Sequence, residues 1–145
     1  MDYNSNNNIG EGERLLLFGP CGTLGSVLVP LLSKQVADPR DLILAYHQHM
    51  PKTQQCTCAH VDLQEKQTVR QVLLAQRPTR IVFMLPTVPN THAMVRNFVE
   101  AFKEAQQTTT VRQVIYVSEG DIDEFLLSRL SCYDGVMDSF QLMAV

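Results

Sequence analysis

Short apolar runs recur along the chain and are separated by longer segments. The first run is Leu15-Leu16-Leu17-Phe18, which follows Arg14 directly and stops at Gly19-Pro20. A continuous apolar run bounded in this way is typical of a strand buried on both faces of a sheet. Similar runs cover residues 42–46, 80–85 and 111–117, and a weaker one covers 58–61. The pattern therefore predicts five strands.

The segments between the runs carry apolar residues at helical spacing. After the first run, one helix face is marked by Leu24, Val27, Leu28, Leu31 and Leu32. Pro30 lies within this helix and predicts a bend, because proline lacks an N–H and clashes with the carbonyl four residues before it. The same spacing predicts helices over 63–75 and 91–106, and acids within 121–124 mark the start of another.

Alternation of strands with helices indicates a parallel sheet, because parallel strands need crossovers that are nearly always helical and right-handed. We expect an α/β domain over residues 14–145, with a doubly wound sheet whose strands lie in the order 3-2-1-4-5. Residues 1–13 are rich in Asn and poor in apolar residues, so they cannot repay the entropy of being ordered. We expect them to form a flexible tail.

Composition narrows the class of function. Twelve Lys and Arg against 15 Asp and Glu give a net charge of −3, which leaves no positive excess for binding a polynucleotide. No apolar run reaches the ~18 residues of a membrane-spanning helix, and the start at Met1-Asp2-Tyr3 is acidic, whereas targeting peptides are basic. The four cysteines do not resemble the disulfide framework of a small secreted fold. We therefore expect no nucleic-acid or membrane partner and a reducing compartment, the cytoplasm or, as the alternative, the nucleus.

Three glycines occupy the junction between the first strand and its helix. They form the pattern GxxGxxG, written out as Gly19-Pro20-Cys21-Gly22-Thr23-Leu24-Gly25. At such a junction glycine permits a tight turn and close packing of helix on strand, and it lets backbone N–H groups approach a diphosphate at the helix N-terminus. A kinase-type phosphate loop is excluded, because the segment lacks the lysine that would hold the β and γ phosphates. A tight turn with no ligand is the alternative interpretation.

The glycine pattern is joined by two further segments, Leu28-Val29-Pro30-Leu31-Leu32 in the helix and Val114-Ile115-Tyr116-Val117-Ser118 in the fifth strand. Together they resemble the short-chain dehydrogenase/reductase superfamily, and its atypical NmrA-like branch fits best. Ser118-Glu119-Gly120-Asp121 is similar to the segment that follows strand five in that branch. The resemblance covers residues 14–121 and implies a Rossmann-like domain that binds NAD or NADP, truncated relative to the family before its sixth strand.

The resemblance also implies roles for individual residues. The residues around the cofactor diphosphate would be Gly19, Cys21, Gly22, Thr23, Leu24 and Gly25. Asp62 and Leu63 follow the third strand, where the family contacts the adenine. Met84, Leu85 and Pro86 would flank the adenosine ribose, and Ser118 matches the active-site serine.

The end of the second strand bears on the choice of cofactor. An NAD binder usually carries Asp or Glu there and an NADP binder often carries Arg, but this chain has Tyr46, His47, Gln48 and His49. With no acid for the ribose hydroxyls, and with His47, His49 and Lys52 nearby, we expect a weak preference for NADP. The preference should strengthen below about pH 6.5, where histidine gains its charge.

The catalytic lysine of the superfamily is missing. Its reductases pair a Tyr with a Lys four residues later, or use a single Lys beyond strand five. Here Met137 follows Tyr133 at that spacing, and the last lysine in the sequence is Lys103. General acid catalysis is worth about 10² to 10⁴ in rate, so its loss predicts little or no turnover.

Histidine and cysteine gather in a second cluster, made of His47, His49, Cys56, Cys58 and His60. One residue between the two cysteines is less than structural zinc sites usually have, so we expect packed cysteines, exposed histidines and no metal site. Cys21 lies at a helix N-terminus, where a thiolate is favoured. It is therefore either a redox-sensitive residue or a packing residue beside the strand.

The sequence thus favours an NAD(P)-binding domain with little or no catalysis, acting as a regulatory or redox-sensing protein. One alternative is a fragment of an NAD(P)-dependent reductase or epimerase that needs a further half. Another is a protein-interaction module whose nucleotide site has decayed. The segment 133–145 is rich in apolar residues and either packs on the sheet or meets a protein partner.

Overall fold

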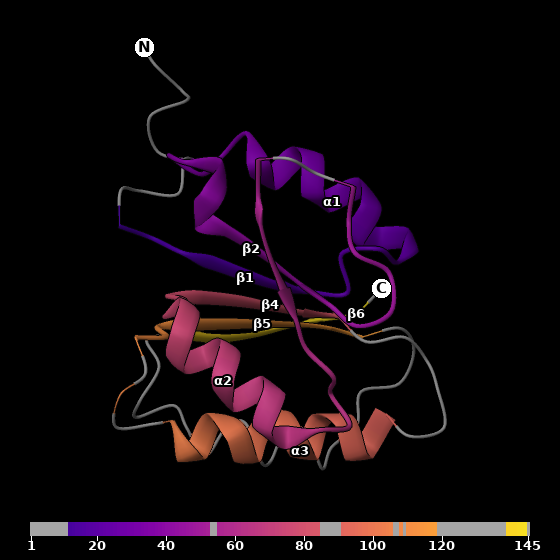
Figure 1. Ribbon diagram of the computed structural model, residues 1–145, viewed down its shortest axis with the longest axis vertical. Helices are drawn as coiled ribbons and strands as arrows, with labels where there is room; N and C mark the ends of the chain where they lie inside the picture. The colour runs from indigo at the N-terminus through magenta and orange to yellow at the C-terminus, as the bar shows by residue number, and fades with distance from the viewer. Residues whose placement is uncertain are drawn as a thin grey trace.

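A computed structural model describes residues 12–52, 55–84, 91–105, 108, 110–118 and 139–144 (Figure 1). These residues form one parallel sheet in the order β3-β2-β1-β4-β5-β6. The strands are β1 (Leu15–Phe18), β2 (Leu42–Tyr46), β3 (Thr57–His60), β4 (Arg80–Met84), β5 (Gln113–Ser118) and β6 (Ser139–Ala144). The order predicted for the first five strands is confirmed.

The sheet has a sixth strand that the sequence did not predict. β6 pairs in parallel with β5 along its whole length, from Gln113 opposite Ser139 to Ser118 opposite Ala144. The prediction that the chain stops before a sixth strand is therefore wrong. The segment Ser-Phe-Gln-Leu does alternate polar with apolar residues, as a strand does, but it is short and lies next to Met143 and Ala144, which break the alternation.

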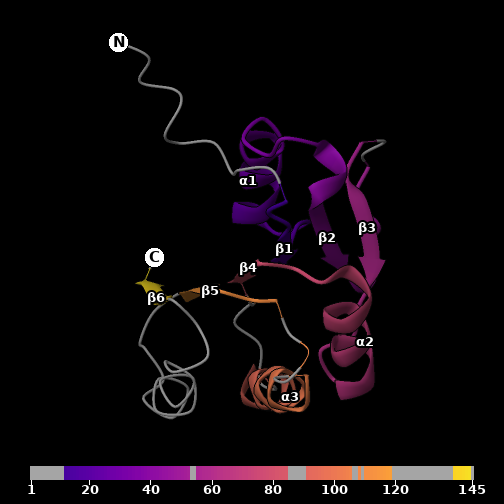
Figure 2. The ribbon, with the colours of Figure 1, turned by 90° about the vertical axis from the view of Figure 1, so that its left-hand side faces the viewer.

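Helices cover both faces of the sheet. α1 (Thr23–Ser33) and the short 3₁₀ helix η1 (Pro39–Asp41) lie on one face, and α2 (Lys66–Gln76) and α3 (Thr91–Glu104) lie on the other (Figure 2). α1 continues through Pro30 to its end, where the Ser33 hydroxyl donates to the Pro30 carbonyl at 2.9 Å. The helix predicted after residue 120 lies outside the described residues. None of the described helices is long and apolar enough to cross a membrane.

The alternating side chains of the strands build two apolar clusters. On the face of α2 and α3, rings from three elements meet: Phe98 of α3 stacks on Phe83 of β4 at 4.4 Å, and Phe18 of β1 meets Phe83 edge-on at 5.1 Å. On the face of α1, Leu17 and Leu44 are fully buried among side chains of the helix. This two-sided burial explains why the strands read as continuous apolar runs.

The apolar stripe predicted for α1 is only partly buried. Leu28 and Leu32 pack on the sheet, as expected, but Leu24, Val27 and Leu31 are exposed. The helical spacing of the apolar residues predicts one broad apolar stripe on α1, but the sheet contacts only one side of that stripe.

The amino-terminal edge of the sheet is held by hydrogen bonds to Arg14. Its guanidinium donates to the carbonyl of Gln76 at 2.7 Å, to the side-chain oxygen of Gln76 at 2.9 Å and to Asp41 Oδ1 at 3.0 Å. Its backbone N–H donates to Thr79 Oγ1 at 2.9 Å. One residue thus joins the start of β1 to η1 and to the end of α2.

Candidate functional site

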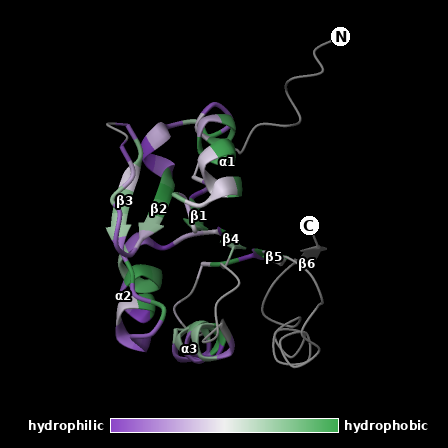
Figure 3. Cartoon of the chain, turned by 90° about the vertical axis from the view of Figure 1, so that its right-hand side faces the viewer, coloured by the Kyte–Doolittle hydropathy of each residue, from purple (hydrophilic) through white to green (hydrophobic). Residues whose placement is uncertain are grey.

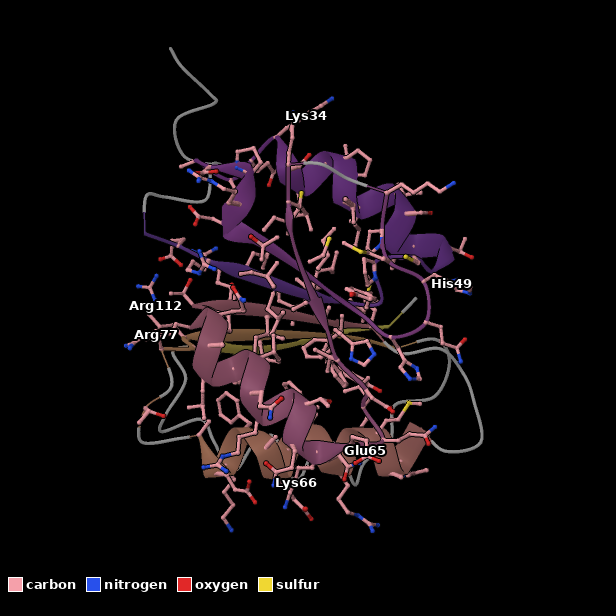
Figure 4. The ribbon with its side chains drawn as sticks, in the orientation of Figure 1. Lys34, His49, Glu65, Lys66, Arg77 and Arg112 are labelled. Atoms are coloured by element: carbon pink, nitrogen blue, oxygen red, sulfur yellow. The ribbon has the colours of Figure 1, made fainter. Side chains whose placement is uncertain are left out.

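Most of the predicted site residues lie at the carboxyl edge of the sheet. Gly19 follows β1, His47 follows β2 and Asp62 lies two residues after β3, and parallel strands bring these three ends to the same edge. His49 lies on this side in Figure 4, opposite Arg77 and Arg112 at the other edge. β1 lies between β2 and β4, so the chain reverses its direction across the sheet next to the glycine turn. Ligands of open α/β sheets bind at such a switch point.

Two of the three glycines are required by the fold itself. Gly19 has a φ of +83°, in the region that side chains rarely adopt, and a Cβ there would lie 2.9 Å from the Met84 carbonyl oxygen. A Cβ on Gly25 would overlap the Gly19 carbonyl and lie 2.9 Å from the Pro20 carbonyl carbon. The first turn of α1 therefore packs directly on the glycine turn, and the turn packs on the end of β4.

Gly22 differs from the other two. Its φ is −73°, which any residue can adopt, and an added Cβ would meet the Gly19 carbonyl at an ordinary 3.6 Å. Gly22 is the N-cap of α1, its N–H donates to the Gly19 carbonyl at 3.4 Å, and its carbonyl accepts from Ser26 at 2.9 Å. No contact among the described residues requires glycine here, although glycine is one of the residues favoured at a helix N-cap.

The N-terminus of α1 has no side-chain cap. No side chain hydrogen-bonds to this cap within the described residues, and the first turn contains no acid. The exposed residues Thr23 and Leu24 lie in this turn. Backbone N–H groups at a helix N-terminus lack partners within the helix and carry a partial positive charge, so this end can accept an anion.

Cys21 connects the glycine turn to the loop after β2. Its exposed thiol donates to the carbonyl of His49 at 3.2 Å. The contact brings the region predicted for the diphosphate beside the region predicted to choose between NAD and NADP.

The His47 imidazole and the Asp62 carboxyl group lie next to each other. His47 Nε2 lies 3.4 Å from Asp62 Oδ2, and both side chains are partly exposed. The His47 ring also lies 5.9 Å from the ring of His60, which in turn meets Tyr46 edge-on at 5.6 Å. The structure thus brings together two residues that the sequence marked separately, at the ends of adjacent strands.

Two residues that hold this loop were missed. The N–H of Asp62 donates to Thr68 Oγ1 at 2.9 Å, and the Thr68 hydroxyl lies 2.8 Å from the Asp62 carbonyl. Asn97 of α3 donates from Nδ2 to the carbonyl of Leu63 at 2.9 Å. Thr68 lies near the start of a predicted helix, which is a usual place for such a contact, but Asn97 is 34 residues from Leu63 and has no local signal.

The remaining predicted residues are only partly described. Leu85 and Pro86 lie outside the described residues. The backbone of Ser118 ends β5, opposite Ala144, and its side chain lies outside the description. Met84 ends β4 and lies beside Gly19.

The histidine and cysteine cluster does not assemble a metal site within the described ranges, where His, Cys, Asp and Glu form no group of three suited to a metal ion. Cys56 and Cys58 are partly buried against the apolar cluster under α1. Burial, together with the nearby thiols of Cys56 and Cys21, raises the pKa of Cys58. Cys58 therefore remains a protonated packing residue at neutral pH.

Comparison with known proteins supports the fold. No protein-family model matches the chain, and no curated protein matches its sequence. Solved structures do match, among them the quinone oxidoreductase QOR2 from Escherichia coli complexed with NADPH, with a TM-score of 0.67 at 15% identity. UDP-glucose 4-epimerase from Brucella ovis in complex with NAD matches with a TM-score of 0.63 at 13% identity. The chain has the Rossmann-like fold of these enzymes.

The match covers most of this chain and about half of each enzyme. It extends over 88% of the chain and 47% of the quinone oxidoreductase, and over 91% of the chain and 51% of the epimerase. The enzyme WbmH from Bordetella bronchiseptica, in complex with NAD⁺, gives a TM-score of 0.60 with 55% of its length covered. The chain therefore spans about half the length of the enzymes it resembles in fold.

Proposed function

We propose that this chain binds a nicotinamide dinucleotide at the carboxyl edge of its sheet and that it acts as a regulatory or redox-sensing protein of the NmrA-like type, with little or no catalysis. Three solved structures with this fold contain NAD, NAD⁺ or NADPH, which supports the choice of ligand. The N-terminus of α1 would receive the diphosphate, and Asp62 and Leu63 would contact the adenine.

Gly22 is the observation that carries the proposal. Gly19 and Gly25 are explained by contacts within the protein, whereas an added Cβ at Gly22 meets only an ordinary contact among the described residues. A glycine that no steric contact among the described residues requires, at the N-cap of a helix with no side-chain cap, would let a diphosphate approach the backbone closely.

The cofactor preference follows from the loop after β2. His47 holds the position where NAD binders usually carry an acid, and it already pairs with the nearby Asp62. A protonated His47 would attract the 2′-phosphate of NADP, and His49 and Lys52 add positive charge to the same segment. The proposal is therefore a weak preference for NADP that increases as the pH falls.

The half-length match favours a second candidate. The chain would supply the nucleotide-binding half of a reductase or epimerase whose other half comes from elsewhere. Under this alternative the cofactor site is the same, but a group outside residues 1–145 replaces the missing lysine.

A thermal-shift titration with NADPH, NADH, NADP and NAD tests the site. A ligand at 100 times its dissociation constant should stabilise the protein by about 2.7 kcal/mol. Gly22→Val should abolish the shift while leaving the ligand-free melting temperature close to that of the wild type. Ser33→Val, at the other end of α1, is the control and should keep the full shift.

The preference is read from the same titration at about pH 6 and pH 8, on either side of the usual histidine pKa. NADPH should gain affinity over NADH at the lower pH, and His47→Gln should remove that gain. If Gly22→Val binds the dinucleotides as tightly as the wild type does, the binding site lies elsewhere. If none of the four dinucleotides binds, the chain is an interaction module with a decayed nucleotide site. Equal or tighter binding of NADH at both pH values would contradict the preference alone.

A further inference from the structure

The loop between β3 and α2 carries a backbone donor that the rest of the described chain does not use. All the other N–H groups of residues 61–65 donate to protein acceptors. In chain order these acceptors are the Tyr46 carbonyl at 2.8 Å, Thr68 Oγ1 at 2.9 Å, Asp62 Oδ1 at 2.9 Å and the Asp62 carbonyl at 2.9 Å. The N–H of Leu63 donates to none of the described residues. This loop therefore keeps one donor for a ligand.

The direction of that donor is set by the peptide group to which it belongs. The carbonyl of the same peptide is that of Asp62, which accepts from the Glu65 N–H at 2.9 Å and lies 2.8 Å from the Thr68 hydroxyl. Both partners lie at the start of α2. In a trans peptide the N–H and the C=O point in opposite directions, so the Leu63 N–H points away from α2.

The carbonyl of Leu63 is held from a different helix. Asn97 of α3 donates from Nδ2 to this carbonyl at 2.9 Å, across 34 positions of sequence. Asn97, Glu100 and Glu104 lie on one flank of α3 at helical spacing. The two acids pair with Lys66, in the first turn of α2, at 3.6 and 2.8 Å. Figure 3 shows α2 and α3 side by side, with hydrophilic residues on their outer sides. The flank of α3 that holds α2 therefore also holds the loop before it.

The helix itself gives no reason for asparagine at this position. Asn97 lies in the interior of α3, where asparagine is less favourable than alanine or leucine because its side chain competes for backbone hydrogen bonds. Its neighbour Phe98 is buried in the core, whereas Asn97 is only partly buried. Its amide bonds to Leu63 and to no other residue in the described part of the chain. The contact with the loop is thus what this side chain does.

Leu63 and Asp62 together present one donor and one acceptor. The Asp62 carboxylate is 24% exposed, and its Oδ1 already accepts from the Gln64 N–H, which leaves Oδ2 with capacity to accept. The edge of adenine carries the complementary pair, because N1 accepts and the 6-amino group donates. A 6-oxopurine such as hypoxanthine carries the reverse pair, because N1–H donates and O6 accepts. The two loop groups therefore match adenine and oppose a 6-oxopurine.

We propose that Asn97 is a positioning residue for recognition of the base, and this inference rests on the dinucleotide site proposed above. By fixing the Leu63 carbonyl, Asn97 holds the Leu63 N–H and the Asp62 carboxylate at the spacing that selects adenine over a 6-oxopurine. Asn97 acts through Leu63 and does not touch the ligand. Without its amide the loop can turn at Leu63, and the donor and acceptor no longer meet the base together. The expected loss is therefore a loss of discrimination between bases.

Calorimetric titration with NADH and with reduced nicotinamide hypoxanthine dinucleotide tests the proposal, because the two ligands differ only at the edge of the base. The titrations are run at about pH 8, above the usual histidine pKa, so that protonated histidine does not contribute. The wild type should bind NADH at least about tenfold more tightly than the hypoxanthine analogue. Asn97→Leu keeps the size of the side chain but removes the donor, and it should reduce this ratio to below about threefold.

Arg96→Leu is the matched control. Arg96 is the exposed neighbour of Asn97 on α3 and bonds to no other residue in the described ranges, so its substitution should leave the ratio unchanged. Asn97→Ser ends closer to the backbone than asparagine and cannot reach the Leu63 carbonyl. It should give the same low ratio as Asn97→Leu, and it carries the test if circular dichroism shows that the leucine variant is unfolded.

The outcomes separate this inference from the proposed function. A wild type that binds both dinucleotides equally would overturn the role of Asn97 and leave the dinucleotide site in place. The same holds if the Asn97 variants lose affinity for both ligands but keep the wild-type ratio, because that result shows a purely structural contact. A wild type that binds neither ligand would overturn the proposed function and this inference with it.

Discussion

Gly22 and Gly25 lie three residues apart, but an added methyl group meets different surroundings at each. At Gly25 it overlaps the glycine turn, whereas at Gly22 it makes an ordinary contact. We expect Gly25→Ala to lower the free energy of unfolding by about 1–3 kcal/mol, because the helix must move off the turn. Gly22→Ala should change it by less than about 0.5 kcal/mol. Urea denaturation of both variants without ligand measures the difference, and equal losses would contradict this division between structural and binding glycines.

The cysteines should differ in reactivity. Cys21 is exposed, whereas burial and neighbouring thiols raise the pKa of Cys58 and keep it protonated. A raised pKa leaves less thiolate at neutral pH, so Cys58 should react with iodoacetamide at least about fivefold more slowly than Cys21. Mass spectrometry of alkylated peptides gives both rates. Saturating dinucleotide should protect Cys21 and leave the rate of Cys58 unchanged, and faster labelling of Cys58 would refute the assignment.

The sequence predicted the glycines better than the side-chain pairs. Gly19, Gly22 and Gly25 lie within seven consecutive residues at one strand-to-helix turn, so the sequence alone shows their spacing. The pairing of His47 with Asp62, and of Asn97 with the Leu63 carbonyl, joins separate elements. Such contacts depend on register and rotamer, which a single sequence does not contain.

The junction around Arg14 joins three elements through one side chain. Its fork-shaped guanidinium donates to two atoms of Gln76 and to Asp41. Lysine keeps the charge but cannot make these bonds together, so Arg14→Lys should lower the free energy of unfolding by about 1–3 kcal/mol. Lys66→Met is the comparison, because Lys66 pairs with Glu104 on the surface between α2 and α3, where ion pairs contribute little. Denaturant titration should show the larger loss for Arg14→Lys, and a larger loss for Lys66→Met would be evidence against the junction.

Most of the helices and strands could be predicted, because strands buried on both faces of a sheet have continuous apolar runs in their sequence. β1, β2 and β4 are the central strands and gave the clearest runs. β6 is the edge strand of the described sheet, and its alternation of polar and apolar residues is too short to predict a strand. The stripe on α1 was identified, but periodicity does not tell which part of a stripe meets the sheet. Leu24, Val27 and Leu31 were therefore expected to face the core and are instead exposed.

We expect the chain to bind a nicotinamide cofactor without oxidising or reducing it. The sequence contains no lysine after Lys103, and Met137 occupies the position where Tyr133 would need one. Arg129 does not replace it, because a guanidinium stays protonated and cannot relay a proton. Purified protein should therefore oxidise NADPH no faster than buffer with quinones, aldehydes and ketones, as followed by absorbance. Sustained turnover that disappears in Ser118→Ala would show an enzyme instead of a sensor.

The central place of β1 also governs the order in which the chain can fold as it is synthesised. Arg14, at the start of the strand, bonds to Asp41 on one side, 27 residues away, and to Thr79 on the other, 65 residues away. One edge of β1 can therefore pair as soon as β2 leaves the ribosome, while the other waits for β4. At roughly 5–20 residues per second the wait lasts a few seconds. During that time Leu15–Phe18 presents an unpaired apolar edge, and nascent chains at this stage should be the form most dependent on a chaperone.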